Sequence, residues 1–312
     1  KDMTVAEAFD KIRRTGMNKE TIYTCYVTDS NRHLEGLVSV KDLLIADQQC
    51  RIDDIMETHV ISVNTHEDQE EVARLFSKYD FLALPVLDKE NRLVGIVTFD
   101  DAMDVLQEEN TEDIEKMAAL MPSDKPYLKT SAWEMWKNRI PWLLLLMISA
   151  TFTGMIISGF EEKLAASVVL TSFIPMLMDT GGNSGGQSSV MIIRGLSLGE
   201  IKLSDLPKVI WKEVRVALLC GISLAAVCFV KLMLVDRWLL GTVGVTIPVA
   251  LVVCGTLMIT VLLAKAIGGT LPILAKRLGF DPAVMASPFI TTIVDALSLL
   301  VYFRLAVWIL HI

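Results

Sequence analysis

Hydrophobic and polar residues are distributed differently in the two halves of this chain of 312 residues. Up to about residue 139, short apolar runs alternate with polar residues, which is typical of a soluble domain built from strands and helices. From residue 140 on, apolar stretches are long enough to cross a bilayer, which takes about 20 residues each. We predict five membrane-spanning helices, over residues 140–160, 164–193, 214–235, 247–275 and 282–312.

The first half contains an internal repeat. Residues 27–42 align without gaps on residues 86–101, and the constant offset of 59 indicates a duplication. Each copy predicts a β-hairpin followed by a helix, with an amphipathic helix ahead of it at 5–14 or 70–78. The prediction for this half is therefore an α+β fold. The two copies resemble a pair of CBS domains, with residues 52–56 as the linker between them.

Charge also separates the halves. The whole chain has a formal net charge of −8, but residues 1–137 carry 16 Lys and Arg against 28 Asp and Glu, whereas residues 138–312 carry 13 against 9. An acidic domain in front of an apolar one argues against nucleic acid as a partner. The five cysteines form no CxxC pair, so we expect neither a zinc site nor a disulfide framework.

One stretch of the second predicted span is polar for a membrane helix. Residues 175–189 are rich in Gly and Ser, which let two helices approach closely in lipid. Asp179, Asn183 and Gln187 are four residues apart, so a helix would place all three on one face. Small residues alone would indicate helix packing, whereas the added polar side chains favour a pore or binding lining.

The last predicted span carries a second polar series. Ser287, Thr291 and Asp295 recur every four residues, with Thr292 beside them. A carboxylate inside a membrane span is expensive unless it meets water, an ion or a partner, so Asp295 is a candidate for an ion path. The alternative is an aspartate that neighbouring helices satisfy structurally.

An acidic segment follows the second repeat, at residues 100–117, and predicts a long helix. Taken alone, such a run of charge is explained by a solvated helix face. Residues 122–126, which include two prolines, are expected to end this helix before the membrane region.

Together these parts resemble the MgtE family of magnesium transporters and channels, whose central motif and pore segment are similar to residues 175–189 and 289–295. The helical cytosolic domain that precedes the CBS pair in that family is missing, and Lys1 as the first residue predicts a truncated chain. Ser287 stands where some relatives have Asn, and Asp179 where some have Gly, which bears on ion selectivity. The resemblance implies the following parts: CBS repeats at 1–50 and 51–99, a connecting plug helix at 100–121, a linker at 122–139 and an all-α domain of five transmembrane helices at 140–312.

The resemblance implies a homodimeric Mg²⁺ channel or transporter, and not an enzyme. It would import Mg²⁺ down the electrochemical gradient and be closed by cytosolic Mg²⁺, so that Mg²⁺ is both the transported and the regulatory ion. The pore or ion-binding residues would be Asp295, Thr291, Thr292, Ser287, Asn183, Gln187 and Asp179. The Mg²⁺-sensing residues would be Asp68, Glu70, Asp80, Asp101, Asp104, Glu109, Glu112 and Asp113, whose hard oxygen atoms suit this cation.

Each repeat also carries a strand-to-helix element, at 36–42 and 95–101, that resembles the one with which CBS domains hold adenine nucleotides. The candidates for binding ATP or another adenine nucleotide are Ser39, Asp42, Thr98 and Asp100. A hydroxyl followed by Asp at the start of a helix is equally the pattern of ordinary helix capping, and both interpretations stay open.

Basic residues beside the predicted spans indicate the orientation. Nine lie on one side and four on the other, which places the CBS pair in the cytosol and the carboxyl terminus outside. We therefore expect a multi-pass protein of the bacterial inner membrane that enters the lipid bilayer at a belt of tryptophans, Trp133, Trp136 and Trp142.

Three other functions share features with this sequence. A transporter of broader specificity stays open, since oxygen ligands serve Mg²⁺, Co²⁺ and Mn²⁺ alike. A CBS-based sensor of metal or nucleotide without transport of its own stays open as well. An intramembrane metalloprotease is a poor match, because His66 and Glu67 are not followed by the second histidine of HExxH.

Overall fold

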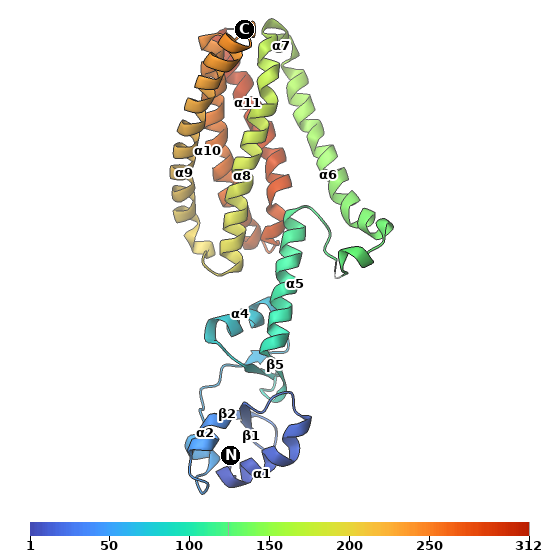
Figure 1. Ribbon diagram of the computed structural model, residues 1–312, viewed down its shortest axis with the longest axis vertical. Helices are drawn as coiled ribbons and strands as arrows, with labels where there is room; N and C mark the ends of the chain where they lie inside the picture. Colours follow the sequence, from blue (N-terminus) through green and yellow to red (C-terminus); the bar gives the residue numbers. More distant parts are fainter. Residues whose placement is uncertain (124, 312) are drawn as a thin grey trace. The chain divides into compact units, whose positions relative to one another are not determined.

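The structure is a computed structural model that describes residues 1–123 and 125–311, apart from the side chain of Ser287. The chain forms two compact units, Lys1–Thr111 and a second that starts at Glu112 (Figure 1). The first holds the α+β repeats and the second holds the long helices. Each unit has a hydrophobic core of its own.

The first repeat is a two-stranded antiparallel sheet with helices packed on it. Thr4 and Glu7 cap the start of its first helix reciprocally, which explains why the helix begins there. Val5, Val38 and Leu43 lie at the centre of its core. Its elements are α1 (Val5–Thr15), the 3₁₀ turn η1 (Gly16–Asn18), β1 (Thr24–Thr28), β2 (Leu34–Ser39), α2 (Val40–Ile45) and α3 (Ile52–Ile55).

The second repeat contains the same hairpin, with a third strand in parallel beside it. Its elements are β3 (Val63–Asn64), α4 (Gln69–Tyr79), β4 (Ala83–Leu87), β5 (Leu93–Thr98) and α5 (Phe99–Met117). Both strands of this hairpin begin and end 59 residues after those of the first, and the register irregularity at the same point of each hairpin recurs as well. The predicted α+β repeat is therefore confirmed.

The acidic helix α5 continues directly from β5 and is 19 residues long. Asp100 and Asp101 lie in its first turn, where the helix dipole favours negative charge. The helix ends at Met117, and Ala119 shortly after it has a left-handed backbone with a φ of 55°. Met117 packs against Ile193 and other buried residues of the second unit.

The second unit is a bundle in which α8 packs against α10 and α11, and α9 packs on α10. In Figure 1, α6 lies near α8 at the end next to α7 and diverges from the bundle toward its own start. The long elements are α6 (Ala132–Gly159), α7 (Glu161–Ala166), α8 (Ile174–Ser197), α9 (Leu206–Lys231), α10 (Ile247–Arg277) and α11 (Ser287–Leu310). The shorter ones are η2 (Tyr127–Lys129), η3 (Val168–Phe173), η4 (Leu203–Asp205), the π-helical η5 (Leu232–Leu239) and η6 (Pro282–Met285).

Four helices in the described part of the chain are long and apolar enough to cross a membrane: Ala132–Gly159, Leu203–Leu239, Ile247–Arg277 and Pro282–Leu310. They correspond to four of the five predicted spans. The remaining one contains α8, whose 24 residues would extend about 36 Å at 1.5 Å per residue. Glycine, serine and amide side chains make this helix less apolar than the other four, and 13 of its 24 residues are buried.

The predicted start of the second span is wrong. The structure has no single helix over 164–193 but α7, then the 3₁₀ segment η3, and α8 only from Ile174. Ser167 leaves the helical region, with φ −145° and ψ 78°. Pro175 lies in the first turn of α8, where its missing N–H is tolerated. Residues 164–175 are all apolar or small, so the hydrophobic pattern does not reveal that the α-helix is interrupted here.

Candidate ion path and acidic sensor

The helix α8 has two different faces. Asp179, Asn183 and Gln187 all lie on an exposed face. The opposite face, which packs on α10 and α11, is buried and consists largely of small residues: Gly181, Gly182, Ser184, Gly185, Gly186, Ser188 and Ser189. The predicted polar stripe therefore exists as one surface that the helices of the same chain leave uncovered.

Close packing explains the glycines of the buried face. A Cβ atom added at Gly182 would lie 2.8 Å from Cγ2 of Thr291 in α11. A Cβ atom added at Gly268 of α10 would lie only 2.2 Å from the carbonyl oxygen of Gly185. The backbones of α8 and α10 thus touch, in the manner of helix pairs joined by small residues in membranes.

The polar residues predicted in the last span lie on α11, which packs against α8. Thr291 packs on the glycine face of α8, and the Thr292 hydroxyl donates to a backbone carbonyl of its own helix. Asp295 is half-buried, and its Oδ1 atom is buried without a hydrogen-bond partner among the described residues. A buried carboxylate oxygen in this state fits an ion or a water molecule. The side chain of the fourth candidate, Ser287, lies outside the described residues.

Three predicted sensing residues lie in α4 or cap its ends. Asp68 caps the start of this helix by accepting a hydrogen bond from the Glu70 N–H at 2.9 Å. Glu70 pairs with Arg74 at 2.5 Å. Asp80 ends the helix with a left-handed backbone, at φ 56°. Each of the three therefore has a local structural role as well.

Three more lie in the first part of α5. The Thr98 hydroxyl donates to Asp101 at 2.6 Å, which caps the start of the helix. Glu109 accepts a hydrogen bond from the Gln69 amide at 2.8 Å and so ties α5 to α4. Asp104 is exposed.

The last two, Glu112 and Asp113, belong to the second unit. Lys116 forms ion pairs with Glu112 and with Asp281, the latter at 2.5 Å, and the Ser197 hydroxyl donates to Asp113 at 3.1 Å. Burial lowers the pKa of Lys116, but its hydrogen bonds to Asp281 and Glu112 outweigh burial and raise this pKa above the usual value. Charge pairing thus holds the end of α5 within the second unit.

Within the residues that the structure describes, no three His, Cys, Asp or Glu side chains come close enough together to hold a metal ion. The eight sensing candidates are spread along α4 and α5 as separate groups. Mg²⁺ keeps several of its waters and is often bound by carboxylates from more than one element. A regulatory site made from these residues therefore needs a rearrangement or a second copy of the chain.

The strand-to-helix elements show helix capping in both repeats. The Ser39 hydroxyl donates to Asp42 at 2.5 Å, and the Asp42 N–H donates back at 3.1 Å. The hydrogen bond from Ser39 lowers the pKa of Asp42. In the second repeat Thr98 pairs with Asp101, and Asp100 is exposed. Capping is thus present, and nucleotide binding stays a prediction.

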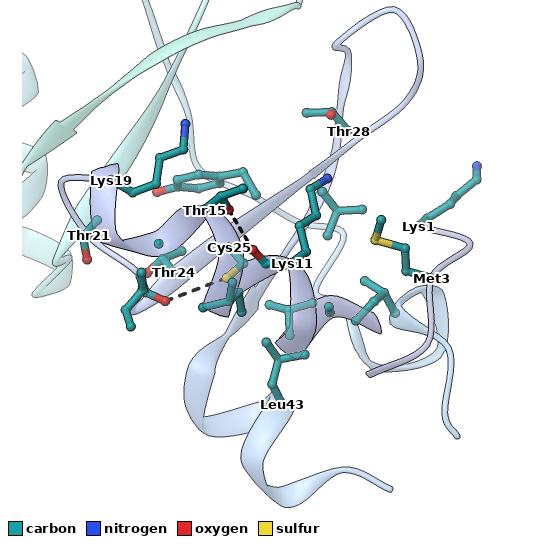
Figure 2. A pocket seen from close by; sticks show the side chains of 18 of the residues that line it. Lys1, Met3, Lys11, Thr15, Lys19, Thr21, Thr24, Cys25, Thr28 and Leu43 are labelled. Atoms are coloured by element: carbon teal, nitrogen blue, oxygen red, sulfur yellow. Dashed lines mark hydrogen bonds between the residues drawn. The ribbon is translucent and has the colours of Figure 1, made fainter. Parts of the chain in front are cut away.

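A cavity of about 770 Å³ lies in the first unit, beside α1 and β1 (Figure 2). Its lining includes Lys11 and Thr15 of α1 and Cys25 of β1. The four nucleotide candidates lie outside the lining of this cavity.

Known families match the two parts of the chain separately. A family model described as MgtE, divalent cation transporter, matches residues 174–305, and the CBS domain model matches residues 1–48 and 52–108. The chain is 41% identical over 309 residues to the magnesium transporter MgtE of Thermus thermophilus, and this match covers 97% of this chain and 66% of that protein. It is 38% identical over 309 residues to the magnesium transporter MgtE of Bacillus subtilis, with 99% and 66% covered.

The chain belongs to the MgtE family. The resemblance seen in the sequence is thereby confirmed, and so is the expectation that the chain is not an enzyme, since this is a family of transporters. The chain spans about two thirds of the length of these MgtE relatives. Among solved structures it is similar to the crystal structure of the cytosolic domain of the Mg²⁺ channel MgtE in complex with ATP, with 51% identity, a TM-score of 0.33, and 33% of this chain and 42% of that chain covered.

The sequence analysis missed one polar group of this MgtE membrane region. Lys265 of α10 and Ser188 of α8 are buried; Lys265 donates to Ser188, and Ser188 donates to Glu213 of α9. The available signal was the lysine itself, since a basic residue in the middle of an apolar span needs a partner.

Proposed function

We propose that this chain is the CBS and membrane part of an Mg²⁺ channel or transporter in which two copies meet at the polar face of α8. The observation that carries the proposal is the exposed stripe of Asp179, Asn183 and Gln187, on a helix whose other face is buried between apolar helices. Lipid is an unfavourable neighbour for such a stripe. A second copy with a water-filled path between the two would cover it.

Asp295 would supply the charge of this path. A hydrated Mg²⁺ beside it would satisfy the buried Oδ1 atom that has no partner in the described part of the chain. Two such carboxylates, one from each copy, would attract a dication without removing most of its waters. The hydroxyl groups of Thr291 and Thr292, which lie about one turn before Asp295 on α11, would hydrogen-bond to those waters. Ser287 stays a further candidate from the sequence.

The membrane potential would drive uptake. We propose that the CBS pair lies in the cytosol of a bacterial cell and that the carboxyl terminus lies outside. A dication that enters a negative interior then gains about 4.6 kcal/mol per 100 mV, at about 2.3 kcal/mol per charge. Import of Mg²⁺ along this gradient needs no hydrolysis of ATP.

Mg²⁺ flux into liposomes tests the proposal. The protein is reconstituted and Mg²⁺ entry is followed with an internal fluorescent indicator, under an imposed inside-negative potential. We expect Asp295→Ala to abolish flux while the protein still elutes as a folded dimer. Ser223→Ala, which removes an exposed hydroxyl of α9, is the control and should conduct normally. Normal flux through folded Asp295→Ala would refute the path.

Regulation would reside in the acidic residues of α4 and α5. At low Mg²⁺ their carboxylates repel one another, and at high Mg²⁺ bound ions draw them together and close the path. The end of α5 offers a connection to the membrane region, because Glu112 and Asp113 belong to the second unit and are paired there. Shifting a gate from 1:99 to 99:1 takes about 5.5 kcal/mol, which suggests several bound ions.

Neutralising three of these carboxylates together tests the regulation. In the triple variant Glu109→Gln, Glu112→Gln and Asp113→Asn, flux should lose its inhibition by Mg²⁺ on the CBS side. Exchange of three exposed carboxylates of the first repeat, Asp10, Glu20 and Asp47, for their amides is the matched control. Unchanged inhibition in the first variant would assign the sensor to other residues.

Two further functions are separated by the same liposomes. Entry of Co²⁺ and Mn²⁺ at rates similar to Mg²⁺ would indicate a transporter of broader specificity, and no flux of any of them would favour a sensor without transport.

ATP binding at the CBS pair is tested by calorimetry with Asp42→Asn. This substitution should weaken binding if the carboxylate holds a ribose, and it should leave binding unchanged if Asp42 only caps α2.

A further inference from the structure

A buried polar bridge joins three helices of the membrane region. Lys265 of α10 is only 5% exposed and Ser188 of α8 only 3%. The Ser188 hydroxyl donates to Oε2 of Glu213 in α9 at 2.6 Å, and Lys265 Nζ donates to the Ser188 oxygen at 3.4 Å. One hydroxyl group therefore connects a lysine and a carboxylate that stand on two other helices.

The ion path as proposed above makes no use of this bridge. Ser188 lies on the buried face of α8, whereas Asn183 and Gln187 lie on the exposed face. The opposite charges of Lys265 and Glu213 cancel, so the bridge has little net attraction for a cation. Either charge alone would be costly between these helices, so each depends on the other.

The location of the bridge suggests its role. Ser188 follows Gly185 by three residues, and Lys265 precedes Gly268 by three, so the bridge lies within one helical turn of the contact between the two backbones. Glycine has no side chain that interlocks with a partner, so this contact alone leaves α8 able to rotate against α10. A directional hydrogen-bonded bridge removes that freedom.

We propose that Lys265 and Glu213, joined through Ser188, are positioning residues that fix the rotation of α8 about its axis and so direct Asn183 and Gln187 into the ion path. The inference rests on the proposed function for the meaning of that path. The rotation of α8 itself can be measured without transport.

The experiment measures thiol labelling at position 187. Gln187→Cys is introduced into a protein whose five cysteines have been replaced by serine or alanine, and a water-soluble methanethiosulfonate reagent is applied in liposomes. Lys265→Met and Glu213→Gln should each change the labelling rate several-fold and lower the Tm measured in detergent. Lys265→Arg keeps the charge and should change both less. Ser188→Ala removes only the bridging hydroxyl, and it should shift the labelling rate in the same direction if a charge variant does not fold.

A second ion pair provides the control. Lys231 and Asp236 pair at 2.7 Å where α9 passes into η5, and Lys231→Met should lower the Tm without changing the labelling rate at position 187. Lys265→Met and Glu213→Gln should each lower the Tm by removing the same bridge. The decrease in the double variant should therefore be smaller than the sum of the two single decreases.

Three outcomes decide between the claims. Unchanged labelling in Lys265→Met and Glu213→Gln, with a lower Tm, would overturn the positioning role and leave a bridge that only stabilises. Additive Tm losses would overturn the bridge itself. The third outcome is that Gln187→Cys is not labelled even when the bridge is intact. It would overturn the proposed ion path and with it the positioning role.

Discussion

Gly268→Ala is a direct perturbation of the contact between α8 and α10. The added Cβ atom would lie 2.2 Å from the Gly185 carbonyl oxygen, 3.0 Å from its carbonyl carbon and 3.2 Å from its Cα atom. Real Cβ atoms essentially never approach closer than 3.0 Å, so the two backbones must separate by about 0.8 Å at this point. Because the atoms in the way are backbone atoms, no side-chain rotation relieves the clash.

The size of the effect follows from two opposing terms. Overpacking a tightly packed contact destabilises a protein by about 1–3 kcal/mol. Alanine in place of a helical glycine returns about 1 kcal/mol through its higher helix propensity. The net loss is then about 0–2 kcal/mol, and a loss of about 2 kcal/mol would lower the Tm of a unit of this size by about 4–8 °C.

Gly221→Ala is the matched control, because it is the same substitution in another membrane helix. A Cβ atom at Gly221 would lie 3.4 Å from the nearest atom, Cγ of Met258, which is an ordinary contact. Its Tm in detergent should stay unchanged or rise, and Mg²⁺ flux in liposomes should be normal. The reasoning would be refuted if Gly268→Ala were as stable and as active as Gly221→Ala.

The remaining predictions concern single hydrogen bonds and charges. Ser39→Ala should destabilise the first repeat by about 1 kcal/mol through loss of the α2 cap, seen in urea unfolding, while Ser39→Thr should not. Since this hydroxyl lowers the pKa of Asp42, its bond to the carboxylate contributes stability above the usual Asp pKa of about 4 and loses it as the pH falls through the lowered pKa. The difference between wild type and Ser39→Ala should therefore shrink in acid to the part that comes from the bond between the Asp42 N–H and the Ser39 oxygen. Lys116→Met should leave Asp281 without its cation and speed proteolysis just after α5, whereas Lys116→Arg should not; equal cleavage of both would contradict this role. Tyr302→Phe should cost about 1–3 kcal/mol, read as a lower Tm, because its hydroxyl donates to the buried Leu170 carbonyl at 2.9 Å.

Much of the fold could be predicted because local patterns determine it. The constant offset of 59 reappears in the strand bounds of both hairpins, and the apolar stretches reappear as long helices. The polar face of α8 was also predictable, since a spacing of four residues places side chains on one side of any helix. Asp179 and Gln187 accordingly lie on the same exposed face.

The features that could not be predicted depend on contacts between distant residues. Nothing near Lys265 in the sequence reveals that it donates to Ser188 of α8, 77 residues away, or that Ser188 connects it to Glu213 of α9, 52 residues from the lysine. The 3₁₀ segment η3 has the same apolar character as a helix and differs only in backbone geometry. The bond between Thr98 and Asp101, by contrast, was predictable, because the offset of 59 places these two residues where the first repeat has Ser39 and Asp42; the choice of Asp100 as a candidate overlooked it.

The central claim, that the exposed face of α8 lines the ion path, is tested most directly by blocking that face during transport. Asn183→Cys in a cysteine-free protein is treated with a positively charged methanethiosulfonate reagent while Mg²⁺ flux is recorded in liposomes. We predict that modification stops flux, that external Mg²⁺ slows modification, and that Ser184→Cys on the buried face is not modified. Full modification of the thiol at position 183 with undiminished Mg²⁺ flux would contradict the account.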